Sequence, residues 1–326
     1  MESLHVETIA VLTSGGDAPG MNPCIRAVVR TALSKSLRVI GVREGYTGLV
    51  QGDMQNLQAR DVGGILQAGG TVLGTSRCME FLEKKGQREA IRNIHEAGID
   101  AMVVIGGDGS MRGARVLAEE GIQVVGLPGS IDNDMWGTNM SIGTDTAMNT
   151  IQDAIDKLRD TASSHRRAFV VETMGRNCGY LAVMAGLVAG AEMVLIPEED
   201  VSVEEVAAAV EASYIRGKTH AIIIVAEGAS IRATTLTEKL NQMDVGFKTR
   251  VTILGHIQRG GRPSAFDRLL ATRLGVAAVE HILDGATDVM LGLDGRLIVP
   301  VQLAEVVAKT RQANLDYYEM CRMLAH

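Results

Sequence analysis

The chain has 326 residues, of which 46% are hydrophobic and 22% are charged, and its net charge at pH 7 is −7. This length exceeds the ~100–200 residues of an ordinary domain and predicts two folded lobes. The acidic balance argues against nucleic acid as the main partner, and the apolar runs are shorter than the ~18–20 residues that span a membrane.

Short apolar runs alternate with longer amphipathic stretches along the chain, a pattern typical of a parallel sheet whose strands are joined by helices. The predicted strands cover residues 8–14, 38–44, 101–107, 123–129, 168–175, 191–198, 220–228 and 251–256. Apolar residues recur at three- and four-residue steps within 146–164 and predict a helix there. Another helix is expected after Ser202, which would cap it, with Glu204 and Glu205 in its first turn.

The first residues and the cysteines are informative about the cellular compartment of the protein. The opening segment MESLHVETIAVLTSGGD lacks the basic and then apolar stretches of a signal peptide. Cys24, Cys78, Cys178 and Cys321 are isolated in the sequence, and no CxxC or Cys/His spacing indicates a structural metal site. We therefore expect a reducing, cytoplasmic setting.

Polar or glycine-rich segments follow seven of the apolar runs. These segments are SGGD, GGDGS, PGSIDND, ETMGR, PEED, AEG and GHIQRGG. Ligands of open parallel sheets bind at the carboxyl ends of the strands, where such segments gather. The sequence therefore predicts an extended polar site that suits phosphate groups.

Asp108 lies between glycines in GGDGS, directly after a predicted strand. Glycines there let backbone N–H groups approach an anion, and a following helix adds the positive end of its dipole, although a tight turn alone would use the same residues. A carboxylate would repel bound phosphates unless a cation lay between them, and Mg²⁺ is the usual cation in that position. We therefore predict that Asp108 binds magnesium. No GxxxxGK[ST] loop occurs in the chain.

Other polar side chains allow a catalytic or a merely structural interpretation. Asp132 and Asp134 could supply a general base for an attacking hydroxyl, or a helix cap and a solvated turn. His256 and Arg259 lie one helical turn apart and could hold one anion together. Glu227 ends a very apolar run and should face a ligand or a buried partner. The arginines at 166, 167, 176 and 250 are, taken singly, typical of a solvated surface.

Taken together, the motifs resemble those of one enzyme family. TSGGDAPGMN, GGDGS, PGSIDND, LRDTASSHRR, ETMGR and GHIQRGG occur in the order found in ATP-dependent 6-phosphofructokinases of the short bacterial type, and the resemblance runs from about residue 6 to beyond residue 300. It implies transfer of the γ-phosphoryl group of MgATP to the 1-hydroxyl of fructose 6-phosphate, the committed step of glycolysis. It also implies a homotetramer whose active sites are shared between subunits.

The resemblance implies an α/β fold of two Rossmann-like, three-layer αβα lobes with mainly parallel sheets. The ATP-binding lobe would comprise residues 1–142 and 256–305, and the fructose 6-phosphate-binding lobe residues 143–255 and 306–326. The implied catalytic residues are Asp132 as the base, Arg77, which would stabilise charge on the transferring phosphoryl group, and Arg176, which would lie by the sugar and its 1-position; Asp108 would bind the magnesium ion.

Two sets of binding residues follow from the same resemblance. The implied ATP site comprises Gly15, Arg77, Cys78, Gly107, Asp108, Gly109 and Ser110. The implied fructose 6-phosphate site comprises Ser130, Ile131, Asp132, Met174, Gly175, Arg176, Glu227, His256 and Arg259, with Arg167 and Arg250 from a neighbouring subunit.

The phosphoryl donor is predicted from two positions. Pyrophosphate-using relatives carry an aspartate where this chain has Gly109 and a lysine where it has Ser130. Gly109 leaves room for a third phosphate, so ATP is the expected donor. Cys78 stands where the family usually has an aromatic residue near the adenine, so nucleotide selectivity could differ.

An effector site for ADP or phosphoenolpyruvate between subunits is also implied. The matching residues are Arg26, Arg30, Arg159, Glu192, Arg216 and Lys218. Ala59 and Thr219 stand where the family has basic residues. Losing two charge-assisted contacts could cost ~3–6 kcal/mol of effector binding, at ~1.5–3 kcal/mol for each, so the effector response stays open.

Three alternative functions agree less well with these motifs. A pyrophosphate-dependent phosphofructokinase conflicts with Gly109. A non-catalytic paralogue that only binds sugar phosphate should have lost Asp132, Asp108 or Arg77, and all three are present. Lipid and NAD kinases share a GGDG-type loop but lack the downstream SIDND and GHIQRGG segments.

Overall fold

The computed structural model describes residues 6–325, which divide into two compact units. Unit 1 comprises the described residues up to Ile131, together with Met135–Thr146 and Arg259–Thr310; unit 2 comprises Asp132–Asp134, Ala147–Gln258 and the described residues from Arg311 onward. The chain thus crosses between units near residues 146, 258 and 310, against predicted lobe boundaries at 142, 255 and 305. The short excursion at Asp132–Asp134 was not predicted.

Unit 1 is built on a seven-stranded sheet in the order β11-β10-β5-β4-β1-β2-β3. The strands are β1 (Thr8–Ser14), β2 (Arg38–Val42), β3 (Met54–Asn56), β4 (Ala101–Gly106), β5 (Gln123–Pro128), β10 (Val289–Asp294) and β11 (Leu297–Gln302). The five inner strands run parallel, and only the edge strands β3 and β11 are antiparallel to their neighbours. The polar segments that follow β1, β4 and β5 therefore lie at one edge of this sheet.

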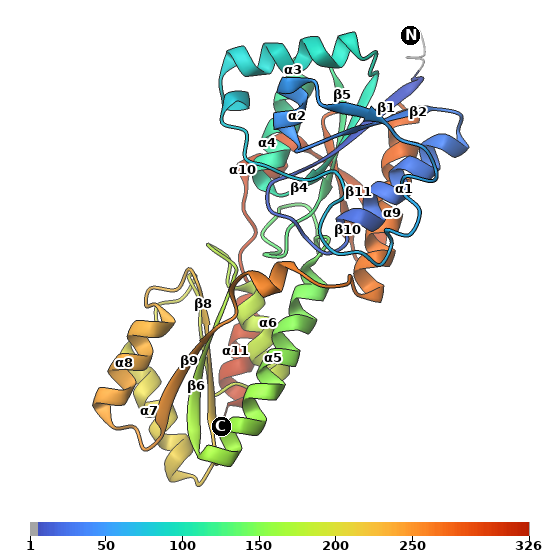
Figure 1. The fold of residues 1–326 in the computed structure, drawn as a ribbon. Coiled ribbons are helices and arrows are strands. Elements are labelled where there is room, and N and C mark those ends of the chain that lie inside the picture. The colour runs from blue at the N-terminus through green and yellow to red at the C-terminus, as the bar shows by residue number, and fades with distance from the viewer. Residues whose placement is uncertain (1–5, 326) are drawn as a thin grey trace. The chain divides into compact units, whose positions relative to one another are not determined.

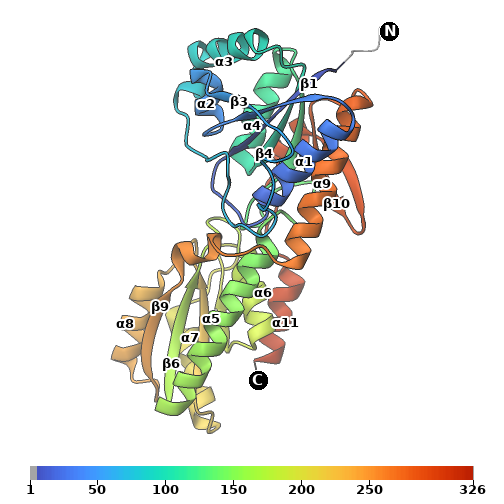
Figure 2. The same ribbon diagram turned by 45° about the vertical axis from the view of Figure 1, so that its right-hand side comes forward.

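Helices cover both faces of the unit 1 sheet (Figures 1 and 2). They are α1 (Met21–Ser34), α2 (Tyr46–Gln51), α3 (Lys84–Glu96), α4 (Asp108–Glu119), α9 (Ala265–Leu283) and α10 (Leu303–Ala308), with the 3₁₀ turn η1 (Glu80–Leu82). Alternate strand residues such as Leu12 and Val104 pack with α2, α3, α4 and α10 in one core cluster. Ile9 and Val103 point to the other face and are equally buried, where α1 and α9 lie side by side (Figures 1 and 2).

Unit 2 has a smaller sheet in the order β7-β8-β6-β9, with all strands parallel. Its elements are β6 (Arg167–Thr173), β7 (Met193–Leu195), β8 (Ala221–Ala226), β9 (Lys248–Ile253), α5 (Thr144–His165), α6 (Tyr180–Ala189), α7 (Val203–Ile215), α8 (Ala233–Met243), α11 (Leu315–Leu324) and the 3₁₀ turn η2 (Gly255–Arg259). One face of the sheet packs on α7 and α8 through residues such as Val170, Ile223 and Leu236. The opposite face is covered by α5, α6 and α11 (Figure 1). Each unit thus has three layers.

The predicted α/β class with mainly parallel sheets is confirmed, and each predicted strand corresponds to an observed one. Two predicted strands differ most from the observed ones at both ends. The segment 191–198 forms only the three-residue strand Met193–Leu195, and the strand predicted at 251–256 is Lys248–Ile253, followed by η2. The helix expected over 146–164 is α5. Ser202 caps α7 as predicted, in a reciprocal capping box with Glu205.

The hairpin β10–β11 and the short strand β3 were missed. Gly292 and Pro300 lower the strand propensity of the hairpin. The pair is nevertheless closed by the two-residue turn Gly295–Arg296, in which Gly295 supplies a positive φ of 56°. Within residues 6–325, no helix combines the length and apolar character that crossing a bilayer requires.

Candidate active site

The loops that follow β1 and β4 meet in unit 1. Gly15 has a φ of +86°, and a Cβ added to it would lie 3.3 Å from the Ser110 Oγ. A Cβ on Gly106 would lie 2.4 Å from both the Ser14 carbonyl oxygen and the Ser110 Oγ. Side chains are therefore excluded at both glycines, and the backbones of two neighbouring strands converge on the first turn of α4.

The N-terminus of α4 has the properties of an anion site. Among the described residues the Ser110 hydroxyl, which is buried, has no hydrogen-bond partner. A Cβ on Gly109 would meet nothing within 4 Å, so this turn faces open space. The first N–H groups of a helix have no partner inside the helix and carry the positive end of its dipole. A phosphate group placed here would satisfy both these N–H groups and the Ser110 hydroxyl.

Asp108 is the first residue of α4 and is partly exposed. Its Oδ2 lies 2.9 Å from the Nε of Arg112, one turn further along the helix. Within residues 6–325, no group of three or more His, Cys, Asp or Glu side chains could by itself hold a metal ion. The donor chemistry at Asp108 therefore suits a cation that receives most of its ligands from a bound phosphate ester rather than from the protein.

Tyr46 is hydrogen-bonded to the first turn of α4. Its hydroxyl donates a hydrogen bond of 2.7 Å to the Ser110 carbonyl oxygen, and its ring stacks on Phe81 with centroids 4.5 Å apart. Burial raises the pKa of Tyr46 above its usual range, so the hydroxyl stays protonated and keeps donating. Gly113 lets the ring approach, because a Cβ there would lie 2.5 Å from it. The start of α4 is thus held by a buried side chain that no sequence motif indicated.

The loop carrying Arg77 is tied to the end of β1. The Thr75 hydroxyl donates to the Gly15 carbonyl oxygen at 2.7 Å, and the Ser76 hydroxyl donates to the Glu44 carbonyl oxygen at 3.0 Å. Arg77 itself is exposed and makes no ion pair among the described residues. Cys78 is half-buried against the core cluster of unit 1. The backbone of this loop is therefore fixed while the guanidinium group can still reach a ligand.

The SIDND segment follows β5. The hydroxyl of Thr144 donates to the Ser130 carbonyl oxygen at 3.0 Å, and Ile131 is fully buried. Asp132 is 6% exposed, and Asn133 adopts a left-handed backbone with φ of 52°. No helix begins within this segment, since α5 starts at Thr144. The alternative interpretation of its aspartates as helix caps is therefore wrong.

In unit 2 the turns after β6 and β8 are locked together. The Arg176 N–H donates to the Glu227 Oε1 at 3.0 Å, and the Glu227 N–H donates to the Thr173 carbonyl oxygen at 2.8 Å. Gly175 has a φ of +136° and Arg176 a φ of 42°. Holding an arginine in this left-handed conformation costs free energy, which is typical of residues that a site must place.

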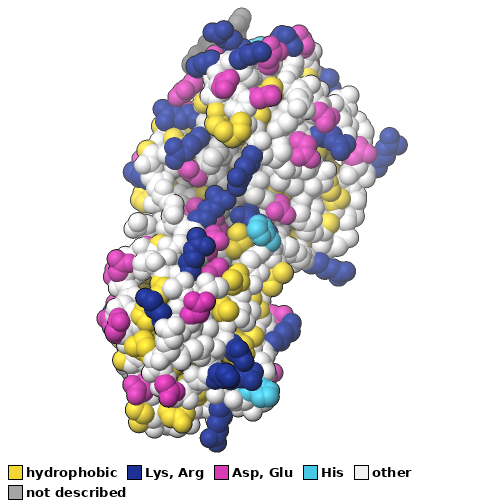
Figure 3. All heavy atoms as spheres, turned by 60° about the vertical axis from the view of Figure 1, so that its left-hand side comes forward, with side chains coloured by type: hydrophobic (Ala, Val, Ile, Leu, Met, Phe, Trp, Pro, Cys, Tyr) yellow, Lys and Arg dark blue, Asp and Glu magenta, His cyan; other side chains and the backbone are white. Residues whose placement is uncertain are grey.

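An open cavity of about 380 Å³ adjoins these turns. It is lined by Glu172, Arg176, Asn177, Glu227, Gly228 and Arg232. Arg176 and Glu227 were predicted site residues, whereas Glu172, Asn177 and Arg232 were not. Two arginines face two carboxylates in this cavity, so its polar lining suits a ligand with several hydroxyl groups. Basic and acidic side chains are likewise interspersed over the molecular face drawn in Figure 3.

Further predicted residues follow from β6 and β9. Met174 is buried, and its N–H donates to the Gln258 Oε1 at 3.2 Å. His256 is exposed on η2. Arg167 stands at the amino end of β6 and Arg250 within β9, and neither lines the cavity.

Arg259 lies over the loop that follows β1. Its Nη1 donates to the Asp17 carbonyl oxygen at 3.3 Å. A Cβ on Gly16 would lie only 1.9 Å from the same Nη1, so a side chain there would displace the guanidinium group. Arg259 is therefore tied to the same glycine-rich loop that meets Ser110.

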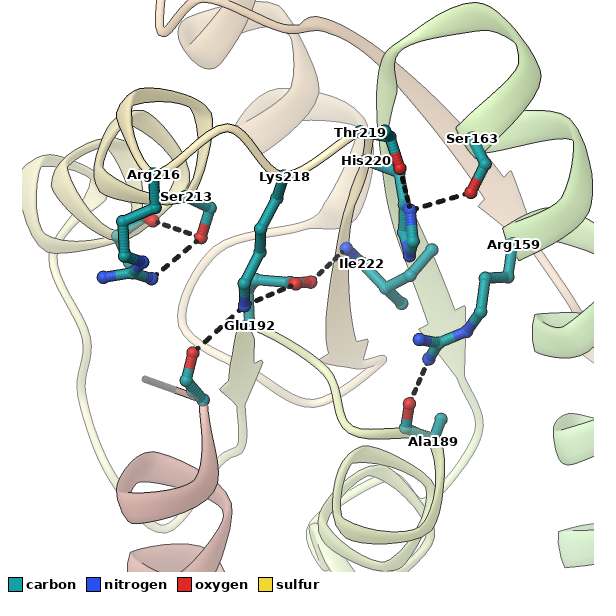
Figure 4. A network of polar contacts seen from close by, with 12 residues as sticks. Arg159, Ser163, Ala189, Glu192, Ser213, Arg216, Lys218, Thr219, His220 and Ile222 are labelled. Atoms are coloured by element: carbon teal, nitrogen blue, oxygen red, sulfur yellow. Dashed lines mark hydrogen bonds and ion pairs between the residues drawn. The ribbon is translucent and has the colours of Figure 1, made fainter.

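Four of the predicted effector residues belong to a polar network in unit 2 (Figure 4). Glu192 is buried, accepts the Ile222 N–H at 2.6 Å and pairs with Lys218 at 3.2 Å. Lys218 also donates to the Ala325 carbonyl oxygen at 3.3 Å. Arg159 donates to the Ala189 carbonyl oxygen, and Arg216 donates to the Ser213 hydroxyl.

The other two effector residues belong to unit 1. Arg26 and Arg30 stand on α1, and Arg30 donates to the Ala59 carbonyl oxygen at 3.5 Å. In unit 2, Thr219 and Ser163 both contact the ring of His220 (Figure 4). Burial lowers the pKa of His220, so its ring adds no positive charge at neutral pH. It therefore does not replace the basic residue that the family has at the position of Thr219.

Comparison with known proteins gives the family. A model described as Phosphofructokinase matches residues 8–282. The chain belongs to the phosphofructokinase family. It is 51% identical over 321 residues to a Thermotoga neapolitana protein named ATP-dependent 6-phosphofructokinase, covering 98% of this chain and 100% of that protein. A Lysinibacillus sphaericus protein of the same name is 48% identical over 320 residues, with the same coverage of both chains.

Solved structures agree with the phosphofructokinase assignment. Pichia pastoris phosphofructokinase in the T-state superposes with a TM-score of 0.89 at 41% identity, covering 93% of this chain and 36% of that longer chain. This chain therefore spans about a third of the yeast chain. A pyrophosphate-dependent phosphofructokinase from Marinobacter aquaeolei has a TM-score of 0.86 at only 19% identity, covering 98% and 91% of the two chains, and shares the fold alone.

Proposed function

We propose that the chain is an ATP-dependent 6-phosphofructokinase, which transfers the γ-phosphoryl group of ATP to the 1-hydroxyl of fructose 6-phosphate and releases fructose 1,6-bisphosphate and ADP. The observation that carries the donor half of this proposal is the first turn of α4. It combines open space at Gly109 with a buried Ser110 hydroxyl that lacks a partner among the described residues. Its relatives with 48–51% identity over their whole length bear this name.

On the donor side, backbone N–H groups at Gly107–Gly109 and the Ser110 hydroxyl would hold the phosphates of ATP. Asp108 fits a Mg²⁺ ion because a single carboxylate, with phosphate oxygens, is the usual ligand set of that ion. Magnesium, when bound, supplies positive charge to the phosphate oxygens. Arg77 has an exposed guanidinium on a fixed loop and would stabilise charge on the transferring group, as lysine does in P-loop enzymes.

On the acceptor side, Asp132 would take the proton from the 1-hydroxyl as that oxygen attacks phosphorus. It is nearly buried, which keeps water from competing for the carboxylate. Arg176 and Glu227 line the open cavity of unit 2 and would contact the sugar, together with Ser130, Met174 and Gly175. His256 and Arg259 would hold the 6-phosphate, for which the guanidinium fork of arginine is well suited.

Turnover measured with ATP and with pyrophosphate in separate reactions tests the donor. We expect fructose 1,6-bisphosphate to form with ATP and magnesium alone. Asp132→Asn should lower kcat by about 10³- to 10⁴-fold, the upper range for loss of a general base. Asp134→Asn, on the same turn, is the matched control and should cost much less. Turnover with pyrophosphate, or an equal loss in both variants, would contradict the proposed donor or base.

A homotetramer with shared active sites forms part of the proposal. Arg167 and Arg250, which do not line the cavity of their own unit, would reach a neighbouring subunit's site. β9 is an edge strand with Val251 37% and Ile253 54% exposed, a surface that another subunit could cover. Mixing inactive Asp132→Asn and Arg250→Ala subunits should restore part of the activity, because some sites then combine intact residues. No recovery in mixed tetramers would contradict sharing.

An effector site at Arg26, Arg30, Arg159, Glu192, Arg216 and Lys218 remains a proposal. Glu192 and Lys218 satisfy each other in the absence of a ligand, so an anionic effector must compete with an existing ion pair. Together with Ala59 and Thr219, this arrangement favours a weak response. Titration of the activity with ADP and with phosphoenolpyruvate, in the wild type and in Lys218→Ala, tests it. A strong response that Lys218→Ala leaves unchanged would contradict the assignment.

A further inference from the structure

Asp267 is a fully buried carboxylate in the first turn of α9 that the function proposed above does not use. Its Oδ1 accepts the Gly143 N–H at 2.9 Å. Its Oδ2 accepts the Thr146 N–H at 2.8 Å and the Thr146 hydroxyl at 2.5 Å. All these donors belong to the first turn of α5 or the residue before it, so Asp267 joins the starts of two helices that are distant in sequence.

Ser264, the N-cap of α9, also joins the starts of the two helices. Its hydroxyl accepts the Asp267 N–H at 3.2 Å and donates to the Asp145 Oδ2 at 2.5 Å. Its own N–H donates to the Thr146 hydroxyl at 2.9 Å. Each helix therefore supplies a carboxylate that is bonded by the start of the other, and the positive ends of both dipoles favour these charges. Asp145, Thr146, Ser264 and Asp267 are called the helix-start clamp below.

The clamp connects to the segment that carries the proposed base. The Thr144 hydroxyl, on the same turn of α5, donates to the Ser130 carbonyl oxygen at 3.0 Å. The Ile142 N–H donates to the Pro128 carbonyl oxygen at 2.9 Å. A Cβ on Gly143 would lie 2.7 Å from the Ala18 Cβ, in the loop after β1, and 3.3 Å from the Ile131 Cγ2. The residues directly before Asp132 thus rest against the turn that Asp267 holds.

The clamp also connects to the segment proposed to bind the 6-phosphate. Ser264 ends the loop that begins at Arg259, and its backbone N–H is fixed by Thr146. Arg259 is held at its other end by the Asp17 carbonyl oxygen. The turn at Gly107–Ser110, in contrast, has no hydrogen bond to any member of the clamp. The phosphate contacts made by that turn should therefore respond less to loss of the clamp than the acceptor contacts do.

We propose that Asp267 is a positioning residue for the phosphoryl acceptor: through the helix-start clamp it fixes the Ser130–Asp132 segment and the Arg259 loop without touching substrate. This inference rests on the proposed function. The carboxylate is needed because only an acceptor on both oxygens satisfies the donors from Gly143 and Thr146. A misplacement of ~1 Å at reacting groups can cost ~100-fold in rate.

Thr146 offers a matched pair of variants for the test. Thr146→Val keeps the side-chain size but removes the hydroxyl that contacts Asp267 and Ser264, whereas Thr146→Ser keeps that hydroxyl. We expect Thr146→Val and Asp267→Asn to lower kcat about 10- to 100-fold and to raise KM for fructose 6-phosphate. KM for ATP should stay within about twofold of the wild type. Thr146→Ser should restore kcat to near the wild-type value.

Thr144→Val tests the link between the clamp and Ser130 with Asp267 intact. It should reproduce the loss in kcat, and the combination with Thr146→Val should cost less than the product of the two effects because both act along one connection. Ser202→Ala, which removes a helix cap of unit 2, is the control for loss of stability alone. It should lower Tm and leave kcat and both KM values unchanged.

The outcomes separate this inference from the function on which it rests. If Asp267→Asn does not fold, the Thr146 pair still decides. If Thr146→Val lowers Tm but keeps kcat and the KM for fructose 6-phosphate, the clamp is merely structural and the inference is overturned. If the wild type itself does not use ATP and fructose 6-phosphate, the proposed function fails first. Calorimetric binding of fructose 6-phosphate then tests the clamp, and equal affinity in the Thr146 pair would overturn it.

Discussion

Gly228 and Arg176 approach each other so closely that a Cβ on Gly228 would lie 1.5 Å from the Arg176 carbonyl oxygen. The turns after β6 and β8 are therefore packed backbone against backbone, and the Glu227 carboxylate adds a hydrogen bond across them. No side chain fits between the two turns. Arg176 has its left-handed backbone conformation, with a φ of 42°, at this contact.

Gly228→Ala should displace the Arg176 turn, because the nearest atom is backbone and cannot rotate away. We expect KM for fructose 6-phosphate to rise at least about tenfold while KM for ATP hardly changes. Ser230→Ala, on the same exposed loop, is the control. Steady-state kinetics with each substrate varied separately checks this, and an unchanged KM for the sugar phosphate would show that Arg176 does not contact it.

Ser110→Ala should separate binding from stability. The Ser110 hydroxyl is buried with no partner among the described residues, so its removal should leave Tm unchanged or slightly higher. Binding of ATP should weaken by about 5- to 20-fold, equivalent to loss of one hydrogen bond to a charged group. Thermal unfolding and a nucleotide titration measure the two effects. A lower Tm with unaltered nucleotide binding would indicate an ordinary core hydroxyl.

Gly109→Ala tests whether the open space at the start of α4 receives the nucleotide. The added methyl group meets no protein atom within 4 Å, so folding should be unaffected. KM for ATP should nevertheless rise several-fold, because a ligand phosphate would then meet the methyl group. Activity with pyrophosphate is measured in parallel. If neither Tm nor KM for ATP changes, the phosphates bind elsewhere.

Ser202→Ala should destabilise unit 2 by about 1 kcal/mol, the usual contribution of a helix cap. Ser202 accepts the Glu205 N–H, and the Glu205 carboxylate accepts the Ser202 N–H in return. These hydrogen bonds hold the pKa of Glu205 below its usual value. Chemical denaturation at neutral pH measures the loss. No change in the unfolding midpoint would show that α7 does not depend on its cap.

Asp267 should give the free energy of unfolding a pH dependence. Burial raises the pKa of its carboxyl from 3.8 to about 6, against the opposing hydrogen bonds from Thr146 and Gly143. Between these values the folded chain keeps a proton that the unfolded chain has released. Stability should therefore fall as pH rises from about 4 to about 6, by on the order of 3 kcal/mol, and this contribution should be level above that window.

Asp267→Asn should remove this pH dependence of the free energy of unfolding, whatever its effect on kcat. Denaturation curves at several pH values between about 4 and 7 compare the two proteins. Asp316→Asn, an exposed carboxylate at the start of α11, is the control for the general effect of losing a carboxylate. Parallel slopes for the wild type and Asp267→Asn would show that Asp267 is ionised throughout the range.

Local patterns in the sequence predicted the strands and the glycine-rich turns of the site. The turn around Asp108 could be predicted because its strand, glycines and helix are contiguous in the sequence. Cys78 could not be placed in this way, since it packs against a core cluster that strands and helices from many parts of unit 1 build together. Glu172 and Arg232 were missed for a similar reason. One lies within a buried strand and the other precedes a helix, and only the fold brings both to one cavity.

The contacts of the helix-start clamp could not be predicted from the sequence either. Asp267 has the ordinary appearance of an acidic residue in the first turn of a helix. Its partners Gly143 and Thr146 lie 124 and 121 residues earlier in the chain. Neither spacing nor periodicity connects residues at such separations, and the buried environment that distinguishes this carboxylate exists only after folding. Tyr46 below Ser110, 64 residues away, is a similar case.

The crossings of the chain between its two units have a consequence for synthesis. β5 lies inside the sheet of unit 1, but its neighbour β10 begins only at Val289, after nearly all of unit 2 has been made. Until then one side of β5 has no strand to pair with and presents unpaired backbone groups. Neither unit is a contiguous piece of chain, so neither is complete when its first long segment has been made. The sheet of unit 1 is complete only after β11 has been synthesised, and the layers of unit 2 only after α11 has followed it.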